Sequence, residues 1–159
     1  MEKDMYVTSE PQLDNHYRLR AASLDDAALW KKFDRHLSQD AFERKVREEM
    51  AWILYVDDTP AGVLRWGMFW DTIPFLNLIF LDEKYRRMGL GRWAMYFWES
   101  WMKRQGYGLI MVSTQVDEQA QHFYRKLGYR DMGAIAMDFP GYQLPSSGPR
   151  KWRSTYSAC

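Results

Sequence analysis

The sequence predicts an α/β fold, with a mixed, mostly antiparallel central sheet flanked by helices. Apolar runs of strand length alternate with segments that repeat apolar residues at helical spacing. Three strand-like runs follow one another across short turns, which is typical of antiparallel pairing. A chain of 159 residues can also bury a core without disulfides or metals. We therefore expect a loose leader at residues 1–16, one domain at 17–139 and an irregular tail at 140–159.

The predicted domain begins with a short strand and two helices. Tyr17–Arg20 has strand character, and Ser23 is a suitable N-cap for a helix through Leu37. A second helix is expected from Asp40 to Met50, because a glutamate follows Asp40 at the spacing of a capping box.

Three consecutive strands follow these helices. Residues 52–56 and 61–70 read as a hairpin joined by an Asp-Asp-Thr-Pro turn. A further turn leads to a strand at Phe75–Leu81. Its continuous apolar character predicts burial on both faces.

The second half of the domain alternates helices and strands. A helix is expected over residues 90–104, whose aromatic face (Trp93, Phe97 and Trp101) we interpret as packing. A short buried strand at 109–113 comes next, followed by a helix from Asp117 to Leu127 with Gly128 just beyond its end. A last strand is expected at 129–139.

The tail departs from these patterns. Pro145 and Pro149 cannot donate ladder hydrogen bonds, and charged residues 150, 151 and 153 interrupt any alternation. The sequence therefore predicts an irregular segment, which leaves the strand at 129–139 with a poorly covered edge. Such an edge favours pairing with a second copy of the chain, as in a homodimer.

The composition bounds the partners. With 22 basic and 21 acidic residues, the net charge of +1 gives no reason to expect a nucleic acid or a membrane. The N-terminus, with Glu2, Lys3 and Asp4, has no signal-peptide character. A single cysteine, Cys159, excludes an internal disulfide framework and fits a reducing cytoplasm. Three scattered histidines give no metal-ligand spacing, so no metal site is expected.

The segment that follows the strand at 75–81 has the features of an anion site. Gly89 and Gly91 allow close approach to the backbone at the start of a helix, where unpaired N–H groups and the helix dipole favour negative charge. Arg86, Arg87 and Arg92 add positive charge, so a phosphate or pyrophosphate fits here. A tight turn with solvated arginines explains these residues equally well. No Gly-Lys-Ser/Thr follows, which excludes the triphosphate loop, and no acidic residue ends a second strand, which a dinucleotide fingerprint needs.

Two motifs resemble those of one family, the GCN5-related N-acetyltransferases (GNAT). Arg86-x-x-Gly89-x-Gly91 after a strand is similar to the family's acyl-coenzyme A pyrophosphate loop. The segment from Asp117 to Tyr129, with its Phe-Tyr pair and its Gly-aromatic pair, resembles the family's helix after the fifth strand. The order of elements from Tyr17 to Phe139 also matches, so the resemblance implies a GNAT-like fold.

The resemblance implies an enzyme, an acetyl-CoA-dependent N-acyltransferase. It implies direct attack by an amine of a small molecule or peptide on acetyl-CoA in a ternary complex. Tyr124 would act as the acid for the leaving thiolate, with Asn77 as a second catalytic residue through a water relay. The coenzyme-binding residues that the resemblance implies are Ile79, Phe80, Leu81, Arg86, Arg87, Met88, Gly89, Leu90, Gly91, Arg92, Asp117, Gln121 and Tyr124.

The sequence departs from the family at the general base. Many members carry a glutamate in the strand before the loop, whereas Phe75 and Asn77 stand there in this chain, and neither can take up a proton. Asp71, Asp82 or a water relay through Asn77 are candidates, and His36 and His122 fit helix-surface positions better. Many members also carry asparagine at the position of Asp117.

Other functions remain open from the sequence. Tyr124 could be a tyrosine at the rim of the core whose hydroxyl meets water. A non-catalytic acyl-CoA-binding module or sensor would keep the anion site and lack the base. A structural domain that binds a partner through aromatic side chains would bind no coenzyme. The sequence does not identify the acceptor.

Overall fold

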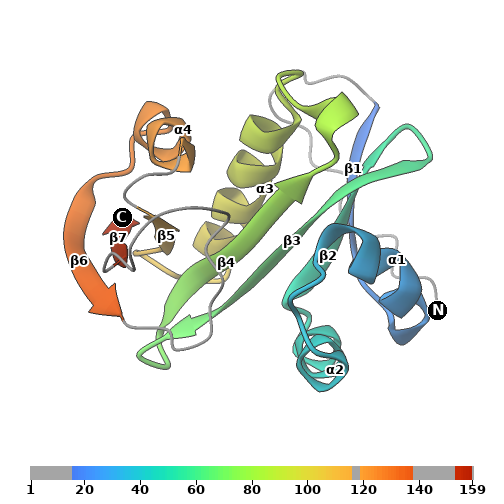
Figure 1. Cartoon of the computed structure of the whole chain (residues 1–159), viewed down its shortest axis with the longest axis horizontal. Helices are drawn as coiled ribbons and strands as arrows, with labels where there is room; N and C mark the ends of the chain where they lie inside the picture. The colour runs from blue at the N-terminus through green and yellow to red at the C-terminus, as the bar shows by residue number, and fades with distance from the viewer. Residues whose placement is uncertain (1–15, 116–118, 138–152, 159) are drawn as a thin grey trace, which may run out of the picture.

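A computed structural model describes residues 16–115, 119–137 and 153–158 of the chain. In these residues seven strands form one sheet in the order β1-β2-β3-β4-β5-β7-β6 (Figure 1). Only β4 and β5 pair in parallel, so the predicted α/β class with a mostly antiparallel sheet is confirmed. The strands are β1 Tyr17–Ala21, β2 Ala51–Val56, β3 Thr59–Phe69, β4 Ile73–Leu81, β5 Met111–Gln115, β6 Asp131–Met137 and β7 Arg153–Ala158.

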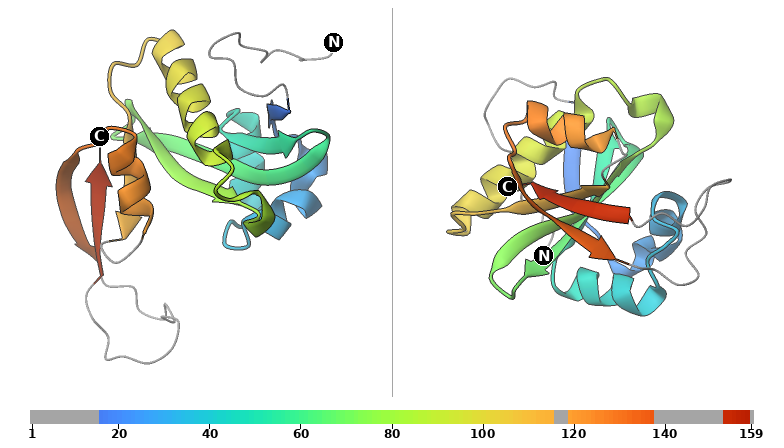
Figure 2. Two further views of the ribbon diagram at one scale, coloured as in Figure 1. Left: turned by 90° about the horizontal axis from the view of Figure 1, so that it is seen from above. Right: turned by 60° about the vertical axis from the view of Figure 1, so that its left-hand side comes forward.

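The helices cover the sheet on two sides (Figures 1 and 2). The apolar residues of α1 and α2 pack with one buried cluster, and those of α3 and α4 pack with another. Alternation along β2 and β3 supplies both clusters, because successive side chains point to opposite faces. The helices are α1 Ala27–Phe33, α2 Gln39–Arg47, α3 Leu90–Arg104 and α4 Ala120–Lys126, with short 3₁₀ turns η1 Leu24–Asp26 and η2 Glu83–Tyr85.

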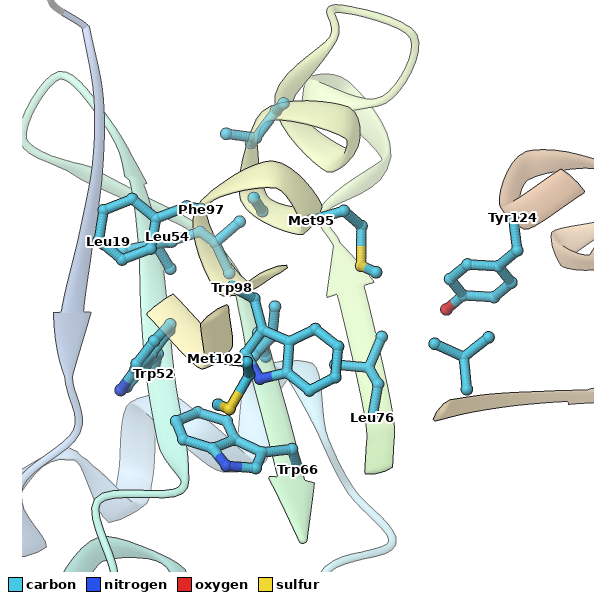
Figure 3. Packing of buried hydrophobic residues seen from close by; sticks show 14 of the residues in the cluster. Leu19, Trp52, Leu54, Trp66, Leu76, Met95, Phe97, Trp98, Met102 and Tyr124 are labelled. Atoms are coloured by element: carbon cyan, nitrogen blue, oxygen red, sulfur yellow. The ribbon is translucent and has the colours of Figure 1, made fainter. Parts of the chain in front are cut away.

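The larger core lies between the sheet and α3. Trp98 of α3 is fully buried and its ring centroid lies 6.4 Å from that of Trp66, which in turn packs edge-on against Trp52 at 4.5 Å (Figure 3). The predicted aromatic face of α3 is confirmed as packing, since Phe97 is buried and its two companions are partly buried against the same cluster. α3 has the predicted bounds.

Several details of the predicted elements are wrong. α2 ends at Arg47 and not at Met50, and β5 begins at Met111 and not at residue 109. α1 ends at Phe33 and not at Leu37, because Asp34 leaves the helix to accept a hydrogen bond from Arg65. α2 begins at Gln39, since Ser38 and not Asp40 caps it by accepting from the Ala41 amide. The strand β4 is not buried on both faces, because its centre at Asn77 is exposed.

The expectation of an irregular tail is also wrong for residues 153–158. They form β7, which lies between β5 and β6 and pairs antiparallel with both. A strand between two neighbours is held by backbone hydrogen bonds on both edges, so it does not need the apolar alternation that the sequence lacks. The prolines of the tail lie in residues 138–152, which fall outside the described part of the chain, as does the predicted leader at 1–15.

Candidate functional site

The two edges of β4 are paired to different extents. Along one edge β4 pairs with β3 from Ile73 to Leu81. Along the other edge the parallel ladder with β5 contains two residue pairs, Phe75 with Met111 and Leu76 with Val112. Beyond Leu76, β4 therefore presents an edge without a strand partner in the described residues. A backbone with such an edge can accept an extended ligand as an added strand.

A β-bulge stands where this open edge begins. Arg65 of β3 faces Leu78, while the next residue, Trp66, faces Leu76, so Asn77 is an extra residue on β4. The bulge turns Leu76 and Ile79 to the same buried cluster and leaves Asn77 exposed. Bulges redirect side chains and interrupt pairing, and they occur often beside active sites.

The open edge leads into the segment that the sequence predicts as an anion site. Gly89 is the N-cap of α3 with φ of +84°, a conformation that favours glycine, and no side chain in the described residues caps this helix end. No atom of the described residues would lie within 4 Å of a Cβ added at Gly89, so this part of the chain leaves the space before the helix open. Tyr17 of β1 fixes the preceding residue, because its hydroxyl donates to the Met88 carbonyl at 2.9 Å. The first amides of α3 are thus directed to an accessible, ordered position.

Two of the three arginines of this segment have partners in the structure. Arg86 donates from Nε to the Leu81 carbonyl at 3.0 Å, and its guanidinium lies over the Phe80 ring. Arg92 donates to the Tyr96 hydroxyl at 3.3 Å, one turn further along α3. All three side chains are exposed, so they surround the helix start with positive charge.

Tyr124 lies across from the open edge of β4, on the side of the sheet where β5 and α4 lie. It lies on α4, which packs on β5, and it is buried among the rings of Phe123 and Tyr129. In Figure 3 its hydroxyl lies on the side of the ring that faces Leu76 and Met95. A phenol in this position can donate a proton or a hydrogen bond to a group that lies between β4 and α4.

The α1–α2 face of the sheet places a lysine beside the bulge. Lys45 of α2 donates to the Trp66 carbonyl, and its Nζ lies 3.4 Å from the Asn77 Oδ1. Sequence reasoning missed this residue because 32 positions separate it from Asn77 and no motif includes it. The pKa of Lys45 is lowered, chiefly because burial disfavours its charged form.

A hollow opens on this same face, at the end of β4. Its volume is about 400 Å³, and both signs of charge line it. It therefore offers room for a polar molecule near Phe80. Its lining residues are Lys32, Phe33, Phe80, Asp82, Glu83 and Arg86.

The sequence-predicted residues thus fall into two groups. The residues from Ile79 to Arg92 form one continuous segment with the open edge and the helix start, and Gln121 and Tyr124 lie on α4 across the gap. Asp117 lies outside the described residues.

The predicted base candidates are dispersed. His36, His122 and Asp71 are exposed. The Asp82 side chain accepts a hydrogen bond from the Lys84 amide and so caps the 3₁₀ turn η2, which is a structural role. Within the described chain no group of three or more His, Cys, Asp or Glu residues is arranged to hold a metal, and no helix there is long and apolar enough to cross a membrane.

Comparison with known proteins gives one family match. The acetyltransferase (GNAT) family matches residues 13–129. No curated protein sequence matches the chain.

Solved structures share the fold at low sequence identity. Ard1 from Thermoplasma volcanium is 20% identical with a TM-score of 0.69, covering 90% of this chain and 95% of that one. The spermidine/spermine N-acetyltransferase SpeG from Vibrio cholerae is 12% identical with a TM-score of 0.68, covering 90% and 91%. A putative streptothricin acetyltransferase from Bacillus anthracis in complex with acetyl coenzyme A is 21% identical with a TM-score of 0.57, covering 68% and 59%.

Proposed function

Because this chain belongs to the acetyltransferase (GNAT) family, we propose that it is an N-acetyltransferase that uses acetyl-CoA. It would transfer the acetyl group to an amine of a small molecule or peptide by direct attack in a ternary complex. Similar folds include an acetyltransferase of spermidine and spermine and one that modifies the N-terminal serine of a ribosomal protein, which supports an amine as the acceptor.

The open edge of β4 is the observation that carries this proposal. It begins at the Asn77 bulge, runs to Leu81 and continues into the exposed start of α3. The backbone of Ile79–Leu81 can pair with an extended amide-containing arm, and the amides of Leu90 to Arg92 can receive a pyrophosphate. These two donor sets follow one another along the chain in the order that the coenzyme requires.

The side chains around this edge support the chemistry. Bound acetyl-CoA supplies a thioester, whose carbonyl oxygen gains negative charge when an amine attacks. A backbone N–H at the bulge can stabilise that charge. The phenol of Tyr124, which is buried on α4, can donate to the leaving sulfur. Arg86, Arg87 and Arg92 stabilise the phosphates of the coenzyme.

The experiment compares two glycines with similar backbone conformations. Gly89 and Gly106 both have positive φ, of 84° and 90°, and a Cβ at either would meet nothing within 4 Å. Gly89→Val and Gly106→Val therefore cost similar conformational energy at opposite ends of α3. Calorimetry with acetyl-CoA should show binding by the wild type and by Gly106→Val, and at least tenfold weaker binding by Gly89→Val.

Thiol release from acetyl-CoA across a panel of amines then tests for transfer. The panel contains free amino acids, polyamines and short peptides with a free N-terminus. Binding without thiol release in every case would identify the chain as a non-catalytic acyl-CoA-binding module. No binding of acetyl-CoA at all would favour a domain that only binds a partner.

A further inference from the structure

The resemblance places a general base at Phe75 or Asn77, and neither side chain can accept a proton, yet a titratable group lies next to Asn77. Lys45 contacts both the Asn77 Oδ1 and the Trp66 carbonyl, the two groups that flank the bulge. Gly67 makes room for this lysine, because a Cβ at that residue would come within 2.8 Å of its Nζ.

Among the described residues, Lys45 has no carboxylate partner. No ion pair in the described residues joins it to an Asp or Glu, although four other basic side chains and His16 have such pairs. Its two contacts are neutral oxygens, and the side chain is half-buried. A lysine in this situation loses hydration without a compensating charge, which favours its neutral form.

The charged groups around Lys45 act in both directions. Arg65 of β3, which is paired with Asp34, and Arg44 of α2 lower the pKa of Lys45, while Glu48, which follows α2, raises it. Burial has the largest effect and lowers the pKa. The neutral fraction near pH 7 to 8 is therefore larger than for an exposed lysine.

Lys45 and Tyr124 lie on opposite sides of the sheet. α2 packs with the cluster that contains Phe42 and Ile53, whereas Tyr124 belongs to the cluster beneath α3. The open edge of β4 passes between them. An acceptor that approaches from the α2 side meets Lys45, and a leaving group on the other side meets Tyr124.

We propose that neutral Lys45, held at the bulge by Asn77 and Trp66, takes the proton from the acceptor ammonium. This role rests on the acetyl transfer proposed above. An amine with a pKa of about 10 is protonated at neutral pH and must lose this proton before it can attack.

The proposed acetyl transfer conserves protons and electron pairs. The N–H bond of the ammonium breaks and its proton moves to the Lys45 Nζ. The freed nitrogen lone pair forms the C–N bond to the acetyl carbon, and the C–S bond breaks with its electron pair on sulfur. Tyr124 protonates the sulfur, while the nitrogen releases its second proton to solvent, from which Tyr124 is reprotonated. Lys45 then returns its proton to solvent, so each turnover releases one proton.

The test uses the amine that gives thiol release most rapidly with the wild type. Lys45→Met should lower kcat/KM by ~10²–10⁴-fold, the usual contribution of general base catalysis. It should also remove the fall of the rate on the acid side of the pH profile. Arg47→Met, which removes the same charge from an exposed position on the same helix, should leave both unchanged. Gly67→Ala keeps the lysine but displaces its Nζ, and should also lower kcat.

Chemical replacement distinguishes proton transfer from positioning. In a Cys159→Ser background, Lys45→Cys treated with bromoethylamine regains an amine of lower pKa than lysine. Activity should return with the acid limb moved to lower pH. A titration of ε-¹³C-labelled lysine by NMR, assigned with Lys45→Met, should give the same pKa as the kinetic limb. Acetyl-CoA affinity should be equal in all these proteins.

Several results would overturn this role. One is an unchanged acid limb in Lys45→Met, and another is a restored rate whose limb does not move after amination. Loss of acetyl-CoA binding in Lys45→Met would indicate a structural role, and a rise in KM confined to anionic acceptors would indicate charge recognition instead. A wild type that binds acetyl-CoA but acetylates no amine would refute both this role and the proposed function, whereas the preceding results refute this role alone.

Discussion

The ion pair between Asp34 and Arg65 allows a quantitative test of what fixes the helical layer to the sheet. Asp34 follows α1, and its Oδ2 accepts from the Arg65 Nε at 2.7 Å. The Trp30 indole nitrogen lies 3.4 Å from the same oxygen. The side chain of Asp34 is 2% exposed and that of Arg65 is 18% exposed, so solvent screens the pair weakly. The perturbations are Arg65→Met, Asp34→Leu and the double variant.

Burial sets the expected magnitudes. Removal of one partner of a buried ion pair costs about 3–5 kcal/mol, because the other charge stays buried without compensation. Arg65→Met leaves the more deeply buried group unpaired, so its cost should lie at the upper end of this range, and that of Asp34→Leu at the lower end. The double variant should be more stable than either single variant, since it leaves no unpaired charge. The free energy of unfolding of a domain of this size is about 5–15 kcal/mol, so each single change removes a large part of the stability.

Urea unfolding at pH 7, followed by tryptophan fluorescence, measures these differences. The control is an exposed pair with the same N–O distance, Arg125 and Asp131, whose Nη2 and Oδ2 are also 2.7 Å apart but whose side chains are 43% and 44% exposed. Arg125→Met should cost about 0–1 kcal/mol. Equal costs for Arg65→Met and Arg125→Met, or a double variant whose loss equals the sum of the single losses, would refute the argument from burial.

Three further predictions concern single side chains. Tyr124→Phe should lower turnover by ~10²–10⁴-fold without changing acetyl-CoA affinity. Tyr129→Phe, which removes the hydroxyl of a neighbouring buried ring, should not affect turnover; steady-state kinetics and calorimetry check both. Burial raises the pKa of Glu99, although the hydrogen bond from the Tyr129 hydroxyl lowers it to a smaller extent. The contribution of Glu99 to the free energy of unfolding is therefore present at low pH and is lost as pH rises through the raised pKa. Urea midpoints from about pH 4 to pH 7 should therefore show Glu99→Gln gaining stability over the wild type as pH rises, and a constant difference would contradict this. A Cβ at Gly62 would lie 2.2 Å from the Phe80 carbonyl oxygen, so Gly62→Ala should shift the end of β4, cost about 1–3 kcal/mol in urea unfolding and weaken acetyl-CoA binding; unchanged affinity would show that this end of β4 does not contact the coenzyme.

Local chemistry decided which elements could be predicted from the sequence. The bounds of α3 were predictable because Gly89 begins it, an aromatic stripe runs along it and Gly106 follows its end. The end of α1 was not, because it depends on the contact between Asp34 and Arg65, which are 31 positions apart. β7 was missed for a similar reason, since its partners in β5 and β6 supply the hydrogen bonds and the segment itself shows no strand pattern.

The candidate site divides in the same way. The segment from Ile79 to Arg92 is contiguous, so its strand, turn and helix start could be predicted together. The Asn77 bulge could not, because a bulge is defined by the register with β3 and a single strand carries no sign of it. Lys45 could not either, because only the packing of α2 against the sheet brings it to Asn77.

In mechanical terms the sheet consists of two groups of strands that are joined by a short parallel ladder. Three antiparallel ladders join β1–β4 into one group, and β5, β6 and β7 form the other. Within the described residues, the two residue pairs between β4 and β5 are the only ladder that joins the two groups. Heat or load should break this short ladder before the longer ones, so amides that bond between β4 and β5 should exchange faster than amides that bond between β2 and β3. Because α4 packs on β5, Tyr124 is connected to the second group of strands. Any molecule that binds both the β4 edge and α4 would link the two groups of strands, and its binding should be measurable as reduced flexibility of the whole sheet.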